Sequence, residues 1–143
     1  MSRPLLGPRI ASVYELQAEW LEPRLNELGV SWSSFQLLST VASAGDEASQ
    51  IEVARRLGVT AATLSESVQS HIERGLLRQV TSEKDKRVRL LVLTPTSTRL
   101  VQEIRNLVIE SEQVMVKGLQ FSETSNAASI LDRVLSNLRS TQG

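Results

Sequence analysis

Two short amphipathic segments separated by one glycine constrain the fold of this chain more than any other feature. The stretch Ser49-Gln50-Ile51-Glu52 fits a capping box, in which the Ser49 hydroxyl and the Glu52 carboxylate each satisfy a free backbone N–H at the start of a helix. The predicted apolar face of this helix comprises Ile51, Val53, Ala54 and Leu57. Gly58 follows and suits the left-handed turn that ends one helix before another begins.

The second segment has the pattern of a helix with one exposed face. Thr60 is the predicted N-cap, and apolar residues repeat every four positions at Leu64, Val68 and Ile72. At 100° per residue the opposite face carries Ala62, Thr63, Glu66, Gln69, Ser70 and Glu73. Two short helices joined by a glycine-containing turn form the helix-turn-helix pattern, whose second helix can lie in the major groove of DNA.

A β-hairpin with a charged tip is predicted next. Leu76–Thr81 and Val88–Leu93 are rich in β-branched and apolar residues and flank the polar run 82–87. Thr94-Pro95 then supplies an N-cap and a first-turn proline for a long helix ending near Gly118. The chain is therefore expected to be mainly α-helical with one small hairpin.

Helices are also predicted on both sides of this central region. A first helix contains Ile10 to Leu21 and is ended or kinked by Pro23, and a second begins at Ser31 or Ser33 and stops near Gly45. A last helix opens near Ser122. Its predicted buried residues are Ile130, Leu131, Val134, Leu135 and Leu138.

Charge is distributed unevenly although the 143 residues sum to a net charge of +0. Residues 51–99 carry nine basic and five acidic side chains, whereas residues 1–50 and 100–143 have net charges of −3 and −1. A basic middle between acidic flanks favours a surface that faces phosphates.

Composition excludes several function classes. The chain has no cysteine and one histidine, so it offers no disulfide, thiolate metal site or catalytic thiol, and no metal or cofactor is expected. No Gly-rich phosphate loop occurs and no nucleophile lies beside a plausible base, which argues against an enzyme. Without a signal sequence or membrane span, the chain is expected to be cytoplasmic.

Three residues admit both a functional and a packing interpretation. His71 falls close to Leu64 on the helical wheel, which favours packing at the core edge over a ligand role. Trp20 and Trp32 are candidates for lining an effector pocket, but aromatic residues of this kind more often anchor a core or an interface.

The order of elements and several motifs resemble the MarR family of winged helix-turn-helix transcription regulators over almost the whole chain. The similar stretches are Val30 to Leu38, Glu52 to Thr60, Ile72 to Leu77, and Asp85-Lys86-Arg87 followed by Val88 to Pro95. The last of these resembles the Asp-x-Arg wing, its second strand and the Leu-Thr-Pro entry to the next helix.

The resemblance implies a single domain over 1–143 that forms a homodimer. Residues 1–29 and 100–143 would supply dimerisation helices, and residues 30–99 the winged helix-turn-helix lobe. A two-fold dimer would place its recognition helices about 34 Å apart, in successive major grooves of a pseudo-palindromic duplex. The resemblance also implies repression that a small organic or aromatic effector relieves, although no effector site is identified.

The expected DNA contacts fall into two sets. The recognition helix would use Thr60, Ala62, Thr63, Glu66, Gln69 and Ser70, and the wing would use Lys84, Asp85, Lys86, Arg87 and Arg89. Arg87 is expected to enter the minor groove with its direction fixed by Asp85. The acidic residues of the recognition face and the zero net charge leave an alternative open, a winged-helix dimer that is a protein-interaction module with little DNA binding.

Overall fold

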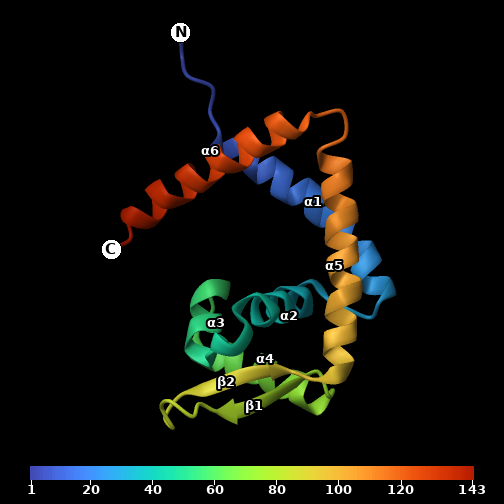
Figure 1. Cartoon of the computed structure of the whole chain (residues 1–143), viewed down its shortest axis with the longest axis vertical. Helices are drawn as coiled ribbons and strands as arrows, with labels where there is room; N and C mark the ends of the chain where they lie inside the picture. The colour runs from blue at the N-terminus through green and yellow to red at the C-terminus, as the bar shows by residue number, and fades with distance from the viewer. The chain divides into compact units, whose positions relative to one another are not determined.

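The computed structural model describes residues 1–143, which divide into two compact units, Met1–Val108 and Ile109–Gly143. The elements follow the order shown in Figure 1: α1 (Gly7–Glu27), α2 (Trp32–Ala44), η1 (Gly45–Glu47), α3 (Gln50–Leu57), α4 (Ala61–Glu73), β1 (Leu77–Thr81), β2 (Arg89–Leu93), α5 (Pro95–Met115) and α6 (Phe121–Ser140). None of the helices combines the length and apolar character that a membrane span requires.

The main core of the first unit lies between α2, the α3–α4 pair and the hairpin. Its buried residues are Leu37, Leu38, Val41, Ala48, Val53, Ala54, Leu64, Val68, Leu76, Leu77 and Leu91. The strands β1 and β2 pair antiparallel, with Leu77 opposite Leu93 and Thr81 opposite Arg89. The sheet covers the core with the face that carries Leu77 and Leu91. The residues of the hairpin tip lie outside this core.

A second core joins α1 to α2 and to the part of α5 within the same unit. It is built from Leu21, Leu25, Val30 and Ile104. Pro23 does not end α1, as one sequence interpretation expected, because the helix continues through it to Glu27. A proline removes one backbone donor, and burial of Leu21 and Leu25 on either side holds the helix together despite that loss.

The two tryptophans pack as anchors. Trp32 makes an edge contact with Tyr14, with ring centroids 6.3 Å apart, and a tilted contact with Phe35 at 5.0 Å. The guanidinium of Arg24 lies 3.8 Å from the ring centroid of Trp20 and donates to the Trp20 carbonyl oxygen. These contacts agree with the packing interpretation, and nothing assigns either residue to an effector pocket.

His71 is buried and connects α4 to α2, in agreement with its predicted place at the core edge. Its Nδ1 donates to the Ser67 carbonyl oxygen at 2.6 Å, since a carbonyl can only accept. Nε2 shares a hydrogen bond of 2.9 Å with the hydroxyl of Ser34, a buried residue of α2. This hydrogen bond fixes the last turn of α4 against the first turn of α2.

We expect His71→Ala to lower the free energy of unfolding by about 2–4 kcal/mol, because it removes packed volume and leaves Ser34 without its partner. Ser34→Ala should cost about 1–3 kcal/mol by orphaning Nε2. Urea unfolding of both single variants and the double variant measures the coupling. Strict additivity of the two losses would contradict a direct hydrogen bond between them.

Candidate nucleic-acid interface

The α3–α4 pair has the local geometry that the sequence predicts for a helix-turn-helix. Ser49 caps α3 by accepting from the Glu52 backbone N–H at 3.2 Å. Gly58 ends α3 with φ +66°, a left-handed conformation that residues with a Cβ rarely adopt. Thr60 then caps α4 by accepting from the Thr63 N–H at 3.1 Å. Gly58 therefore ends the first helix and Thr60 starts the second.

The N-cap and the outward face of α4 carry every residue predicted for DNA contact by this helix. Leu64, Val68 and His71 are buried on the opposite side. The predicted contact residues of this segment are all exposed: Thr60, Ala62, Thr63, Glu66, Gln69 and Ser70. No lysine or arginine lies within Ala61–Glu73, so the face is polar and acidic rather than basic.

A short series of side-chain hydrogen bonds links α3, α4 and β1, and no sequence pattern predicts it. Gln50 donates from Nε2 to the Ser65 hydroxyl at 3.0 Å, and Gln79 donates from Nε2 to Gln50 Oε1 at 2.6 Å. Gln50 and Gln79 are 29 residues apart, and no periodicity or capping signal pairs them. These hydrogen bonds link α4, through Gln50 of α3, to β1.

The wing presents one arginine in a fixed direction. Asp85 accepts from the Arg87 backbone N–H at 3.0 Å and from its Nε and Nη2 at 3.1 and 3.2 Å. These bonds lower the pKa of the Asp85 carboxyl because they favour its ionised form. The Arg87 side chain is still 90% exposed. The predicted Asp85–Arg87 pair is therefore confirmed as a local ion pair that leaves the guanidinium accessible.

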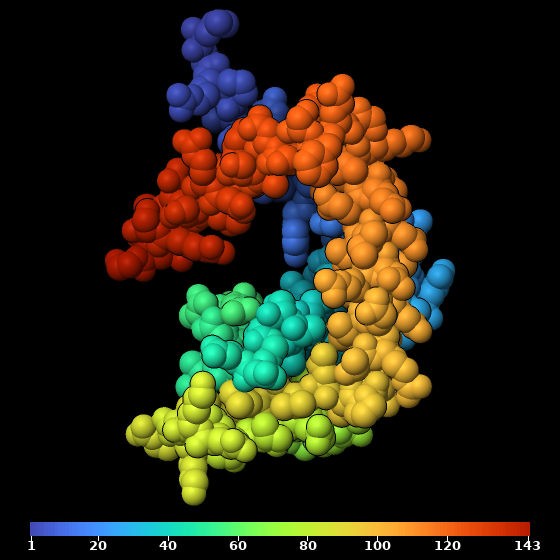
Figure 2. Space-filling model, viewed as in Figure 1, coloured from blue at the N-terminus to red at the C-terminus, as the bar shows by residue number.

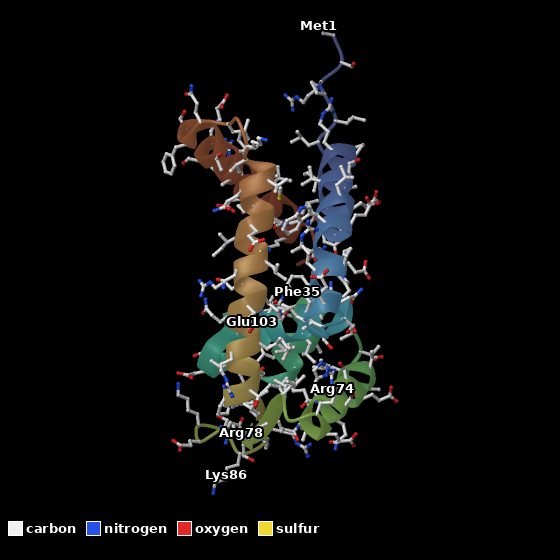
Figure 3. The ribbon with its side chains drawn as sticks, turned by 90° about the vertical axis from the view of Figure 1, so that its right-hand side faces the viewer. Met1, Phe35, Arg74, Arg78, Lys86 and Glu103 are labelled. Atoms are coloured by element: carbon white, nitrogen blue, oxygen red, sulfur yellow. The ribbon has the colours of Figure 1, made fainter.

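The other wing cations lie in different surroundings. Lys86 is exposed at the far end of the hairpin (Figure 3), and Arg89 is exposed where β2 begins. Figure 2 shows the hairpin tip standing out from the rest of the first unit. These positions suit two side chains that would meet a large external partner.

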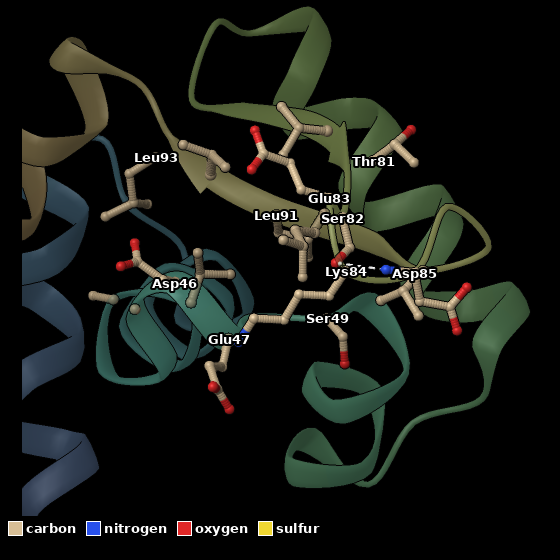
Figure 4. A pocket seen from close by; sticks show the side chains of 17 residues that line it. Asp46, Glu47, Ser49, Thr81, Ser82, Glu83, Lys84, Asp85, Leu91 and Leu93 are labelled. Carbon is tan, nitrogen blue, oxygen red and sulfur yellow. Dashed lines mark hydrogen bonds between the residues drawn. The ribbon is translucent and has the colours of Figure 1, made fainter.

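Lys84 is directed elsewhere. A groove of about 1150 Å³ lies between the hairpin, η1 and the end of α2, with Val41 and Leu91 among its apolar residues and Asp46 and Glu47 at its edge. In Figure 4 the Lys84 side chain extends across this groove toward Glu47. Lys84 is thus separated from the other wing cations, although the sequence predicts one common set of wing contacts.

Hydrogen bonds to the main chain attach the hairpin to the rest of the first unit. The Leu91 N–H donates to the Ala48 carbonyl oxygen at 2.8 Å, and Ser49 forms a bridge with Leu90. At the open end of the hairpin, beside the Leu77–Leu93 pair, the Thr94 hydroxyl donates to the Gly75 carbonyl oxygen at 2.7 Å. The hairpin is therefore attached along β2 to the residues just before α3, and at its open end to a residue just after α4.

Glu52 does not complete the predicted capping box. Its carboxylate accepts from Arg55 Nη2 and Nε at 2.6 and 2.9 Å and from Arg56 Nε at 3.1 Å, while the Ser49 N–H donates to the Glu47 carbonyl oxygen instead. Hydrogen bonds from Arg55 and then Arg56 lower the pKa of Glu52 to about 2. Two arginines in reach offer more charge stabilisation than one backbone N–H.

The low pKa of Glu52 predicts an acid-dependent loss of stability. A carboxyl whose folded-state pKa lies below its unfolded value stabilises the folded chain above pH 4.5, and this contribution disappears as the pH falls toward about 2. We expect Glu52→Gln to be less stable than the natural chain at pH 7 and equally stable near pH 2. Urea unfolding across this range measures it, and a difference that does not change with pH would contradict the ion pairs.

Comparison with known proteins identifies relatives of this architecture. Residues 28–88 match the model of the MarR family. The transcriptional regulator PA3341 is 27% identical, with a TM-score of 0.85 over 95% of this chain and 99% of that chain. Its likeness extends over both units of the chain, well beyond the residues that the family model matches.

Two solved structures of DNA complexes share the fold. A mutant of MarR from E. coli, complexed with operator DNA, is 23% identical with a TM-score of 0.73, and the match covers 91% of this chain and 93% of that chain. The S. aureus MepR–DNA complex is 18% identical with a TM-score of 0.77, covering 94% and 99%. The predicted fold class, mainly helical with a two-stranded wing, is confirmed.

Proposed function

We propose that this chain, as a member of the MarR family of winged helix-turn-helix transcription regulators, binds pseudo-palindromic double-stranded DNA as a homodimer and represses transcription until an effector releases it. The observation that carries the proposal is the pairing of an outward-facing α4 with a wing whose Arg87 is fixed and accessible. Both DNA-complexed structures of similar fold support a DNA partner. The chain would act in the cytoplasm, where such an operator is found.

The contacts divide between sequence recognition and affinity. The exposed face of α4 would meet base edges in the major groove, and Arg87 would enter the adjacent minor groove, where narrow A·T segments attract a guanidinium. Lys86 and Arg89 would contact phosphates. Lys84 would contribute only if its side chain left the groove beside Glu47.

Exposed apolar side chains on the terminal helices support self-association. On α1 they are Ile10, Val13, Tyr14 and Leu16, and on α6 they are Phe121, Ile130, Leu131, Leu135 and Leu138. Repeated apolar residues on one face of a helix are costly to leave in water, and a two-fold dimer buries the same face of both copies. The burial expected for α6 in the sequence analysis is therefore absent from the single chain and is assigned here to the dimer.

Effector control would require a ligand that binds the form with lower DNA affinity more tightly. Only such a difference in affinity shifts the equilibrium between the two forms. A small organic or aromatic molecule is the proposed ligand class.

A salt series on duplex DNA tests the function. We expect the natural chain to bind random duplex fragments at low salt, and selection from a random duplex library to yield two half-sites about one helical turn apart. The logarithm of the affinity should fall linearly with the logarithm of salt concentration, because bound phosphates release counterions. A flat response would instead favour the alternative function, a protein-interaction module, which the acidic residues Glu66 and Glu73 would suit.

A further inference from the structure

The centre of the exposed face of α4 carries carboxylates and no cation. With Leu64 and Val68 pointing into the core, Ala62, Glu66, Gln69 and Glu73 lie on the opposite side of the helix. A face of this kind meets the negative potential of DNA without any compensating positive charge of its own. The acidic side chains on it must therefore find donors on the bases or weaken the complex.

Glu66 is the strongest unoccupied acceptor on this face. The three ion pairs of the chain involve Glu52 and Asp85, and Glu66 makes no side-chain hydrogen bond. Its neighbours are engaged, because the Ser65 hydroxyl accepts from Gln50 and the Gln69 amide donates to Glu73 at 3.5 Å. Glu66 lies in the second turn of α4, on the half of the helix that begins at the Thr60 cap.

We propose that Glu66 determines specificity by restricting the operator to half-sites that present a cytosine amino group to the second turn of α4. This inference rests on the proposed DNA-binding function and names the class of site bound. The cytosine N4 amino group donates into the major groove, and a carboxylate is its matching acceptor. Guanine and thymine present acceptors there, which repel Glu66.

Adenine is a poorer match than cytosine. Its N6 amino group also donates into the major groove, but the N7 acceptor beside it repels the second carboxylate oxygen. Cytosine has no acceptor on that side of its amino group. The Glu66 charge therefore acts in two ways. It favours binding to half-sites with cytosine at this position, and it weakens binding to half-sites with any of the other three bases.

The penalty distinguishes Glu66 from an ordinary contact residue. A side chain that only adds an attractive contact loses affinity for the operator when it is removed. A carboxylate that is repelled by most sequences restrains binding to random DNA, so its neutralisation raises the affinity for random DNA while lowering discrimination. The expected change in the operator-to-random affinity ratio is about tenfold, the size of one good base contact.

Glu66→Gln tests the proposal because it keeps the shape of the side chain and removes its charge. We expect library selection with the natural chain to give a fixed C·G pair in each half-site, and selection with Glu66→Gln to lose it. In titrations, the variant should bind random duplex several-fold more tightly and discriminate about tenfold less. Exchanging the selected C·G pair for G·C should weaken the natural chain and leave the variant nearly unaffected.

Glu103→Gln is the matched control, since it removes the same charge from an exposed position on α5 (Figure 3). An equal rise in random-DNA affinity with this control would overturn the proposal in favour of a general charge effect. So would a selected site that keeps its cytosine with Glu66→Gln. If either occurs while Arg87→Ala still weakens salt-dependent binding, the DNA-binding function stands and only the role of Glu66 fails. A natural chain that binds no duplex at low salt would overturn both.

Discussion

Replacing both Leu131 and Leu135 with aspartate is expected to separate the protomers and to lower the affinity for a two-half-site operator by about 10²- to 10⁴-fold. Both leucines are exposed on the apolar face of α6 in the single chain, at 43% and 46%. Four charges facing one another across a two-fold interface have no compensating partner. The second half-site then loses the high effective concentration that a linked protomer provides.

Ser129→Asp with Ser136→Asp is the matched control, because both serines are exposed on the opposite side of the same helix. Sedimentation measures the mass of each variant, and titration with one-half-site and two-half-site duplexes measures affinity. The leucine variant should bind a single half-site as the natural chain does. A leucine variant that remains dimeric would contradict the assignment of α6 to the interface.

Removing the wing arginine should produce the second-largest effect. We expect Arg87→Ala to weaken operator binding by about tenfold or more for each wing and to reduce the salt slope, because one phosphate-proximal cation is lost from each protomer. Asp85→Asn should cost less, since it keeps the cation and removes only the ion pair that directs it. Fluorescence anisotropy across a salt series measures both variants.

Arg105→Ala provides the comparison for charge alone, because Arg105 is exposed on α5 rather than on the wing. The preference of Arg87 for a narrow minor groove gives a further check. Substituting G·C for A·T pairs under the wing should weaken the natural chain and leave Arg87→Ala nearly unchanged. Undiminished binding by Arg87→Ala would remove the wing from the interface.

The local elements could be predicted from the sequence because each has a nearby chemical signal. Ser31, Ser49 and Thr60 cap helices where expected, Gly58 takes its left-handed turn, and both strands of the hairpin lie within the predicted segments. The exposed face of α4 followed from a helical period that the core enforces at Leu64 and Val68. Short-range rules suffice where the competing conformations are few.

The errors arose where a distant or competing partner decided the outcome. The helical period places Ile51 on the apolar face of its helix, yet Ile51 is 81% exposed, because this eight-residue helix buries only the narrow strip around Val53 and Ala54. Glu52 binds arginines one turn later in place of the capping position. The Gln50–Gln79 contact required knowledge of how the hairpin folds back on α3.

The terminal helices show a different limit. Periodicity correctly marked an apolar face on α6, but that face is exposed in the single chain. An apolar stripe predicts burial without stating which molecule covers it. The sequence therefore predicts that a partner covers α6, and the proposed dimer supplies that partner as a second copy of the chain.

The attachment of the wing through main-chain atoms at Ala48 and Leu91 has a consequence for how the strength of DNA binding can evolve. Main-chain bonds are indifferent to side-chain identity, so the exposed tip residues Glu83, Lys84 and Lys86 can be exchanged without disturbing the scaffold that supports them. Such exchanges would change the strength and the salt dependence of DNA binding, while the exposed face of α4 would keep the sequence preference. A library randomised at these three positions is expected to vary in DNA affinity while its members keep a nearly constant melting temperature.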